Sequence, residues 1–194
     1  MRPRLAWKQV LKALGGFAAG VALWAGFSPF YRQALVPPAE LILHLTEPTN
    51  VTELLENEGG GIIVNRSDFP PESPRPGVAT RDLTFNVVLL CALFALSRKT
   101  FSNSNVAGFG LAMIVLWLTH ILAVVVRVKK IYAFQLGEWS MVHYGDLSRN
   151  VWGSLDHFYR VIGMFAVAFV LWWFLRGENW PLRRSRARSK RDRR

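Results

Sequence analysis

The sequence predicts an all-α membrane protein with four transmembrane helices and a small external cap between the first and second helices. The chain of 194 residues is 51% hydrophobic and only 19% charged, whereas a soluble domain carries about 25% charged residues. Most charged residues lie outside four apolar blocks, and about 20 apolar residues are enough for a helix to cross the hydrocarbon core. The apolar content excludes a disordered chain, and a single cysteine excludes a disulfide scaffold.

The four blocks are residues 11–30, 81–98, 107–126 and 160–176. The second and fourth are only about 15–16 residues long between their flanking arginines, but these arginines can extend their side chains to the interface, so both are predicted as spans. The first block also resembles a signal peptide, because basic residues precede an apolar stretch. No small-residue cleavage site follows it, so an uncleaved membrane anchor is favoured.

Residues 31–80 form the predicted cap, which lies between the arm and first helix (1–30) and a three-helix membrane core (81–176). The segment that begins at Pro37 and Pro38 predicts a short helix along the membrane surface. GGGIIVN at 59–65 predicts a turn and a short strand, and the four prolines of residues 68–77 predict irregular structure.

The distribution of basic residues predicts the orientation. Lysines and arginines gather in the N-terminal arm (Arg2, Arg4, Lys8, Lys12), in the 97–105 loop (Arg98, Lys99) and in the tail 177–194 with the preceding Arg176. Because cytoplasmic loops are rich in Lys and Arg, we expect both termini inside a bacterial inner membrane and residues 31–80 and 128–158 outside. Arg127, Lys129 and Lys130 depart from this rule. We expect the tail to lie on anionic lipid rather than on nucleic acid.

Five polar residues fall in the outer half of the predicted spans or at their outer surface: Asn86, His120, Arg127, His157 and Arg160. Ionisable and amide side chains are costly in lipid, so their presence there needs a reason. One reason is structural, because hydrogen bonds between helices contribute about 1 kcal/mol each. The other is a binding pocket, and because the five residues come from three spans we take them as the candidate binding site.

The sequence lacks the motifs of nucleotide-binding loops, zinc proteases and serine hydrolases. GGG at 59–61 lacks the Lys-Ser/Thr of a nucleotide-binding loop, and neither HExxH nor GxSxG occurs. Glu138, His143 and Asp146 lack the spacing of a metal site, so we expect neither a metal nor a cofactor. Cys91 lies in an apolar stretch, where a thiol behaves as a small apolar side chain rather than as a nucleophile.

Residues 80–176, about half of the chain, resemble the core of the exosortase/archaeosortase family of membrane cysteine transpeptidases. The resemblance rests on a short basic inner loop (Arg98, Lys99), a span that ends in Arg127, an external loop, and His157 before the last span. The family has a nucleophilic cysteine at the outer start of the preceding span. Here Thr84-Phe85-Asn86 stands at that position, and Cys91 lies one to two turns deeper.

The resemblance implies a small membrane protein associated with an exosortase-type system. We therefore expect a non-catalytic accessory component of envelope protein sorting or polysaccharide export, with membrane lipids and a membrane protein such as an exosortase as its partners. The alternative is a divergent transpeptidase that uses Cys91, Arg127 and His157.

Overall fold

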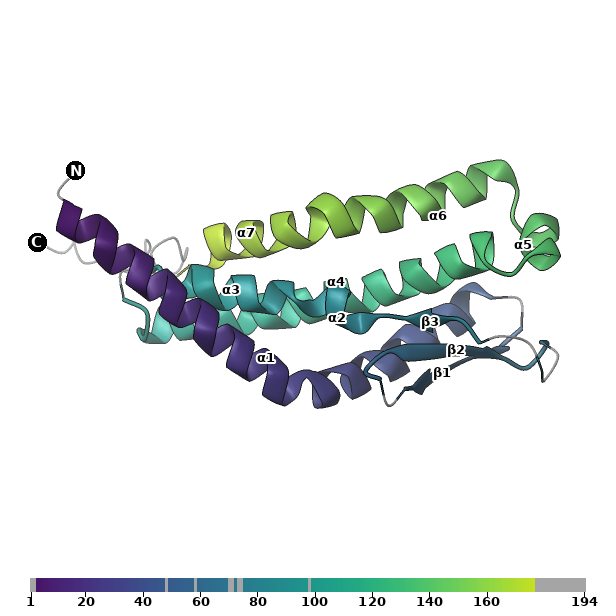
Figure 1. Ribbon diagram of the computed structural model, residues 1–194, viewed down its shortest axis with the longest axis horizontal. Coiled ribbons are helices and arrows are strands. Elements are labelled where there is room, and N and C mark those ends of the chain that lie inside the picture. Colours follow the sequence, from purple (N-terminus) through teal and green to yellow (C-terminus); the bar gives the residue numbers. More distant parts are fainter. Residues whose placement is uncertain are drawn as a thin grey trace, which may run out of the picture. The chain divides into compact units, whose positions relative to one another are not determined.

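The computed structural model describes residues 3–47, 49–57, 59–69, 72, 75–97 and 99–176, with side chains from residue 7. These residues are mostly helical and include one small sheet (Figure 1). The elements are, in chain order, α1 (Pro3–Thr46), β1 (Thr52–Glu56), β2 (Ile62–Arg66), β3 (Gly77–Val78), α2 (Thr80–Thr84), α3 (Asn86–Ala95), α4 (Asn103–Phe134), α5 (Glu138–His143), α6 (Asp146–Phe158), the π-helical turn η1 (Tyr159–Gly163) and α7 (Met164–Leu175).

The chain divides into two compact units. The first unit comprises residues 1–25, 86–116 and 165–194, and the second comprises residues 26–85 and 117–164. Helices α1 and α4 contribute their first parts to one unit and their last parts to the other, so each unit has its own core built from segments far apart in the sequence.

Within the described residues, three helices are long and apolar enough to span a membrane: Trp7–Thr46, Asn103–Phe134 and the continuous helical segment Asp146–Leu175. This confirms the helical fold and is consistent with a membrane protein, whereas four spans are not confirmed. The second predicted span is divided into α2 and α3, and α3 has 10 residues. At 1.5 Å per residue α3 is about 15 Å long, well short of the roughly 30 Å hydrocarbon core.

Helix α1 continues through three internal prolines and is 44 residues long. The separate surface helix expected after Pro37 is therefore wrong, since that segment is the last part of α1. Leu35, Ala39 and Leu43 lie on one face there and are completely buried. Their packing offsets the loss of about 3 kcal/mol or more that a proline causes inside a helix.

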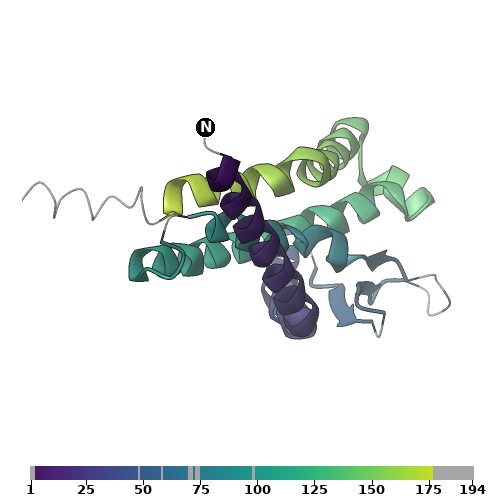
Figure 2. The ribbon, with the colours of Figure 1, turned by 60° about the vertical axis from the view of Figure 1, so that its left-hand side comes forward.

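The cap contains a three-stranded antiparallel sheet in the order β1-β2-β3, of which only the middle strand was expected. The sheet lies beside the last part of α1 (Figures 1 and 2). Leu54, Ile62, Val64 and Val78 from the three strands are buried against α1 and the last part of α4. The turn between β1 and β2 requires Gly60, whose φ of 81° disfavours any residue with a side chain.

The external loop predicted over residues 128–158 is mostly helix. Helix α4 extends to Phe134, and α6 begins at Asp146. The aromatic content of the segment suggested an interfacial loop, but the buried residues Ile131 and Tyr132 belong to the core of the second unit.

In the first unit, α1 packs closely on α3 through Gly16 and Gly20, which form a GxxxG pattern. A Cβ atom at Gly20 would lie 2.9 Å from the Cβ of Cys91 and 3.1 Å from the Cα of Val88. Small residues allow two membrane helices to approach in this way. Cys91 therefore has a packing role between the two helices.

The tail 177–194 and Arg98, on which part of the orientation depends, lie outside the described residues. Arg176 is described, and its guanidinium carbon lies 5.0 Å and 4.6 Å from the ring centroids of Trp172 and Trp173.

Candidate functional site

A cluster of opposite charges joins α4 to α6 in the second unit. At its centre is Asp156 of α6, which is only 2% exposed. Arg127 Nη1 donates to both carboxylate oxygens of Asp156, at 2.9 and 2.7 Å, and Lys130 Nζ donates to Oδ2 at 2.8 Å. Arg160 Nε lies 3.4 Å from the same Oδ2. We call these four residues the Asp156 cluster.

Helix geometry explains why these side chains meet. Arg127 and Lys130 are three residues apart on α4, and Asp156 and Arg160 are four residues apart along α6 and η1, so each pair shares one face. Arg160 lies within the π-helical turn η1. Such turns are rare inside helices and are frequent at functional sites.

The cluster has more positive than negative charge. Three cations share a single carboxylate, so the cluster has a net charge of +2. The side chains of Arg127, Lys130 and Arg160 are 23%, 24% and 39% exposed. The cations are therefore accessible from outside the protein, whereas the carboxylate is not.

Of the five residues predicted as a binding site, Arg127 and Arg160 are brought together by the structure. His157 is exposed on α6, next to Asp156 in the sequence. Asn86 is buried at the start of α3, in the first unit. His120 is completely buried on α4, where its Nδ1 forms a hydrogen bond of 2.6 Å with the hydroxyl of Tyr31 on α1.

The Tyr31–His120 hydrogen bond is expected to stabilise the packing of α1 on α4. Replacing Tyr31 by phenylalanine removes the hydroxyl and keeps the ring, so we expect the free energy of unfolding to fall by about 1 kcal/mol. Equilibrium unfolding in detergent micelles measures this change. An unchanged stability would show that the bond contributes nothing beyond the packing of the ring.

Arg127, Lys129 and Lys130 form the basic run of α4. Lys129 has partners other than Asp156. Lys129 Nζ lies 3.8 Å from Oε1 of Glu47, and Nη1 of Arg66 lies 3.9 Å from the same oxygen. All three side chains are at most 7% exposed. Each cation of the run therefore has an acidic partner, which explains how Arg127, Lys129 and Lys130 can depart from the usual distribution of basic residues.

Arg66 is held by both charge and aromatic rings. Its Nε and Nη2 donate to the two carboxylate oxygens of Asp68 at 2.9 and 2.7 Å. These hydrogen bonds lower the pKa of the Asp68 carboxyl below its usual value. The guanidinium carbon lies 4.7 Å from the ring centroid of Tyr132 and 4.6 Å from that of Trp139. A cavity of about 290 Å³ adjoins these groups.

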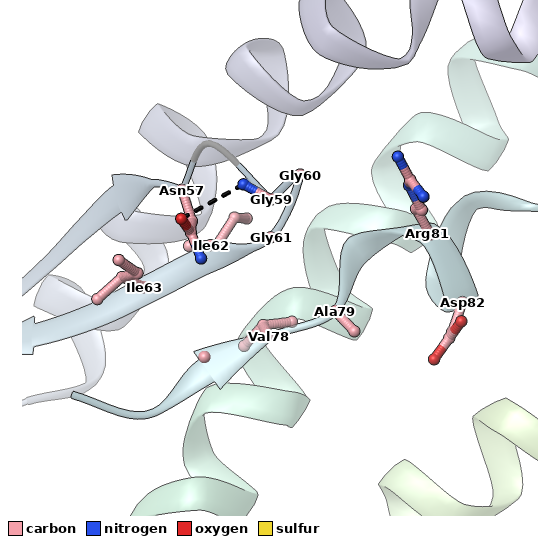
Figure 3. A pocket seen from close by; sticks show the side chains of 11 residues that line it. Asn57, Gly59, Gly60, Gly61, Ile62, Ile63, Val78, Ala79, Arg81 and Asp82 are labelled. Carbon is pink, nitrogen blue, oxygen red and sulfur yellow. Dashed lines mark hydrogen bonds between the residues drawn. The ribbon is translucent and has the colours of Figure 1, made fainter. Parts of the chain in front are cut away.

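A second pocket of about 380 Å³ lies beside the turn between β1 and β2 and extends to α2 (Figure 3). Its lining is mainly glycine and aliphatic residues. Gly59 N donates to the side-chain oxygen of Asn57 at 3.4 Å, and the side chains of Arg81 and Asp82 point in opposite directions (Figure 3). The pocket therefore lacks the converging polar groups that a specific site needs.

Sequence reasoning missed Asp156, Lys130, Glu47 and Arg66. The departure of the α4 basic run from the positive-inside rule was a usable signal, because cations near a membrane require acidic partners. Asp156, four residues before Arg160, was the nearest candidate. Within the described residues no group of three or more His, Cys, Asp or Glu side chains has the arrangement of a metal site.

Comparison of the chain with protein-family models, curated proteins and solved structures found no match. The Asp156 cluster is therefore interpreted from its own chemistry.

Proposed function

We propose that the protein is a non-catalytic membrane component that uses the Asp156 cluster to hold a carboxylate or phosphate group of a membrane protein partner. The observation that carries the proposal is the presence of three accessible cations on one buried carboxylate. Arginine is suited to bidentate binding of carboxylate and phosphate groups. Asp156 fixes the three cations, and their remaining positive charge attracts the partner's anionic group.

The proposed setting is a bacterial inner membrane with both termini in the cytoplasm and the Asp156 cluster near the outer surface. The positive N-terminal arm and tail support this orientation. We propose as partner an exosortase or a related component of protein sorting or polysaccharide export, on the basis of the resemblance of residues 80–176. The fourth span, predicted over residues 81–98, belongs to the same proposal.

Cys91 has no catalytic role in this proposal. Its side chain packs beside Gly20 and borders an apolar groove whose lining contains no histidine. An apolar environment disfavours the thiolate that a cysteine transpeptidase needs.

The proposal predicts opposite results for two substitutions. Arg127→Gln is expected to reduce co-purification with an exosortase of the same organism by about tenfold, because a guanidinium suited to binding the partner's carboxylate or phosphate is lost. Cys91→Ser is expected to leave co-purification and envelope sorting unchanged, since it replaces one small packed side chain by another. Both variants are measured as full chains extracted from membranes, with equal membrane amounts as the control for folding.

A wild-type chain that does not co-purify with the exosortase would overturn the choice of partner. Full association of the Arg127→Gln variant would limit the Asp156 cluster to a structural role. Loss of sorting in the Cys91→Ser variant, together with a working Arg127→Gln variant, would favour the cysteine enzyme.

A further inference from the structure

An apolar groove of about 440 Å³ runs along the first unit, between the first part of α1 and the segments of α3 and α4 that pack on it. Its volume lies within the range of small-molecule sites. Apart from a few polar residues, the lining is apolar; it includes Ala19, Cys91, Phe94, Val106 and Phe109.

Adjacent glycines on α1 create the groove. At Gly16 the helix touches α3, where an added Cβ would collide with Ala95. At Gly15 the helix faces the groove, and an added Cβ would meet no atom within 4 Å. Helix α1 therefore contacts α3 at Gly16 and leaves an open space at Gly15.

Polar groups line part of the same groove. Lys12 is exposed, and its Nζ lies 3.4 Å from the carbonyl oxygen of Ser97, a long hydrogen bond that leaves two N–H donors of the ammonium group for a ligand. Thr100 and Asn105 also belong to the lining, and Asn105 Nδ2 donates to the Thr100 carbonyl oxygen at 2.8 Å. The groove therefore combines an apolar wall with a cationic group.

We infer that this groove binds one acyl chain of an anionic phospholipid, with the lipid phosphate at Lys12. Two of the helices that form it, α1 and α4, are long and apolar enough to span a membrane, so the groove opens towards hydrocarbon chains rather than water. A lipid that carries both a flexible chain and a negative charge matches both parts of the lining. The inference does not depend on the proposed partner, because the groove and the Asp156 cluster lie in different units.

Native mass spectrometry of the full chain in detergent tests the inference, with phosphatidylglycerol and phosphatidylcholine of identical acyl chains as probes. We expect the wild type to retain phosphatidylglycerol in preference to phosphatidylcholine. Lys12→Gln is expected to lower that preference about fivefold, which corresponds to about 1 kcal/mol for one cation at a membrane surface. Lys8→Gln, an exposed lysine outside the groove lining, is the matched control and is expected to keep the preference.

A second pair of variants tests the acyl-chain part. Gly15→Leu places a side chain in the groove and is expected to reduce retention of both lipids. Gly26→Leu makes the same change on the same helix, at a position outside the groove lining where an added Cβ also meets no atom within 4 Å, and is expected to retain both. All variants keep the basic tail, so differences among them do not arise from it.

Retention by Gly15→Leu equal to that of the wild type would overturn the groove as the binding site. An equal preference in Lys12→Gln and Lys8→Gln would overturn the role of Lys12 at the phosphate.

Discussion

Replacing Asp156 by alanine is expected to lower the free energy of unfolding by about 3 kcal/mol, the lower end of the range for breaking a buried ion pair. The carboxylate is 2% exposed and holds Arg127, Lys130 and Arg160, so its removal leaves three cations next to one another without an acid. The cations are partly exposed and regain some solvation, which keeps the effect near that lower end. Equilibrium unfolding in detergent micelles measures the change.

Asp146→Ala is the control for this substitution, because Asp146 is exposed in the first turn of the same helix. Its removal is expected to cost less than about 1 kcal/mol, the contribution of a charge near a helix terminus. Equal losses for the two variants would contradict the central position of Asp156 in the cluster. Raised salt is expected to stabilise the Asp156→Ala variant relative to the wild type, since ions screen the repulsion among the cations.

Replacing Gly20 by leucine is expected to destabilise the first unit by about 3 kcal/mol, the upper part of the usual range for overpacking. An added Cβ would lie 2.9 Å from the Cβ of Cys91 and 3.1 Å from both the Cα and the carbonyl oxygen of Val88. Two of these three atoms belong to the backbone of α3, so a side-chain rotation cannot relieve the contact. The helices α1 and α3 must then separate.

Gly26→Leu is the matched control here as well, because it places the same side chain on α1 where the Cβ meets nothing within 4 Å. We expect its stability to remain within about 0.5 kcal/mol of the wild type. If the two leucine variants unfold at the same denaturant concentration, the close contact of α1 with α3 is not needed for stability.

Hydropathy was sufficient to predict a helical membrane protein, because long apolar helices give a strong and local signal. Hydropathy was insufficient for the segments in which tertiary packing determines the secondary structure. The prolines of α1 suggested a helix boundary, yet the buried face formed by Leu35, Ala39 and Leu43 keeps the helix continuous. β3 was missed because it has only two residues. β1 is as long as β2, but its hydrogen bonds join it to residues that lie 6 to 14 positions later in the sequence.

The candidate site was predicted in part for a similar reason. The cost of a charge in lipid drew attention to Arg127 and Arg160, but it does not reveal which acid neutralises them. Asp156 lies 29 residues after Arg127, and only the packing of α6 against α4 brings them together. His120 was chosen for the same reason, as an ionisable side chain inside a predicted span. In the structure it forms a hydrogen bond with Tyr31 inside the core.

Helix α4 has a fixed rotational register because its basic run divides between two sides. Arg127 and Lys130 point to Asp156, whereas Lys129 points to Glu47. One inserted residue turns the following part of a helix by about 100°. A single uncharged residue inserted between His120 and Arg127 would therefore separate all three cations from their acids at once, although it would leave the net charge of the chain unchanged. Natural variation in this stretch is accordingly expected as substitution and not as a change in length.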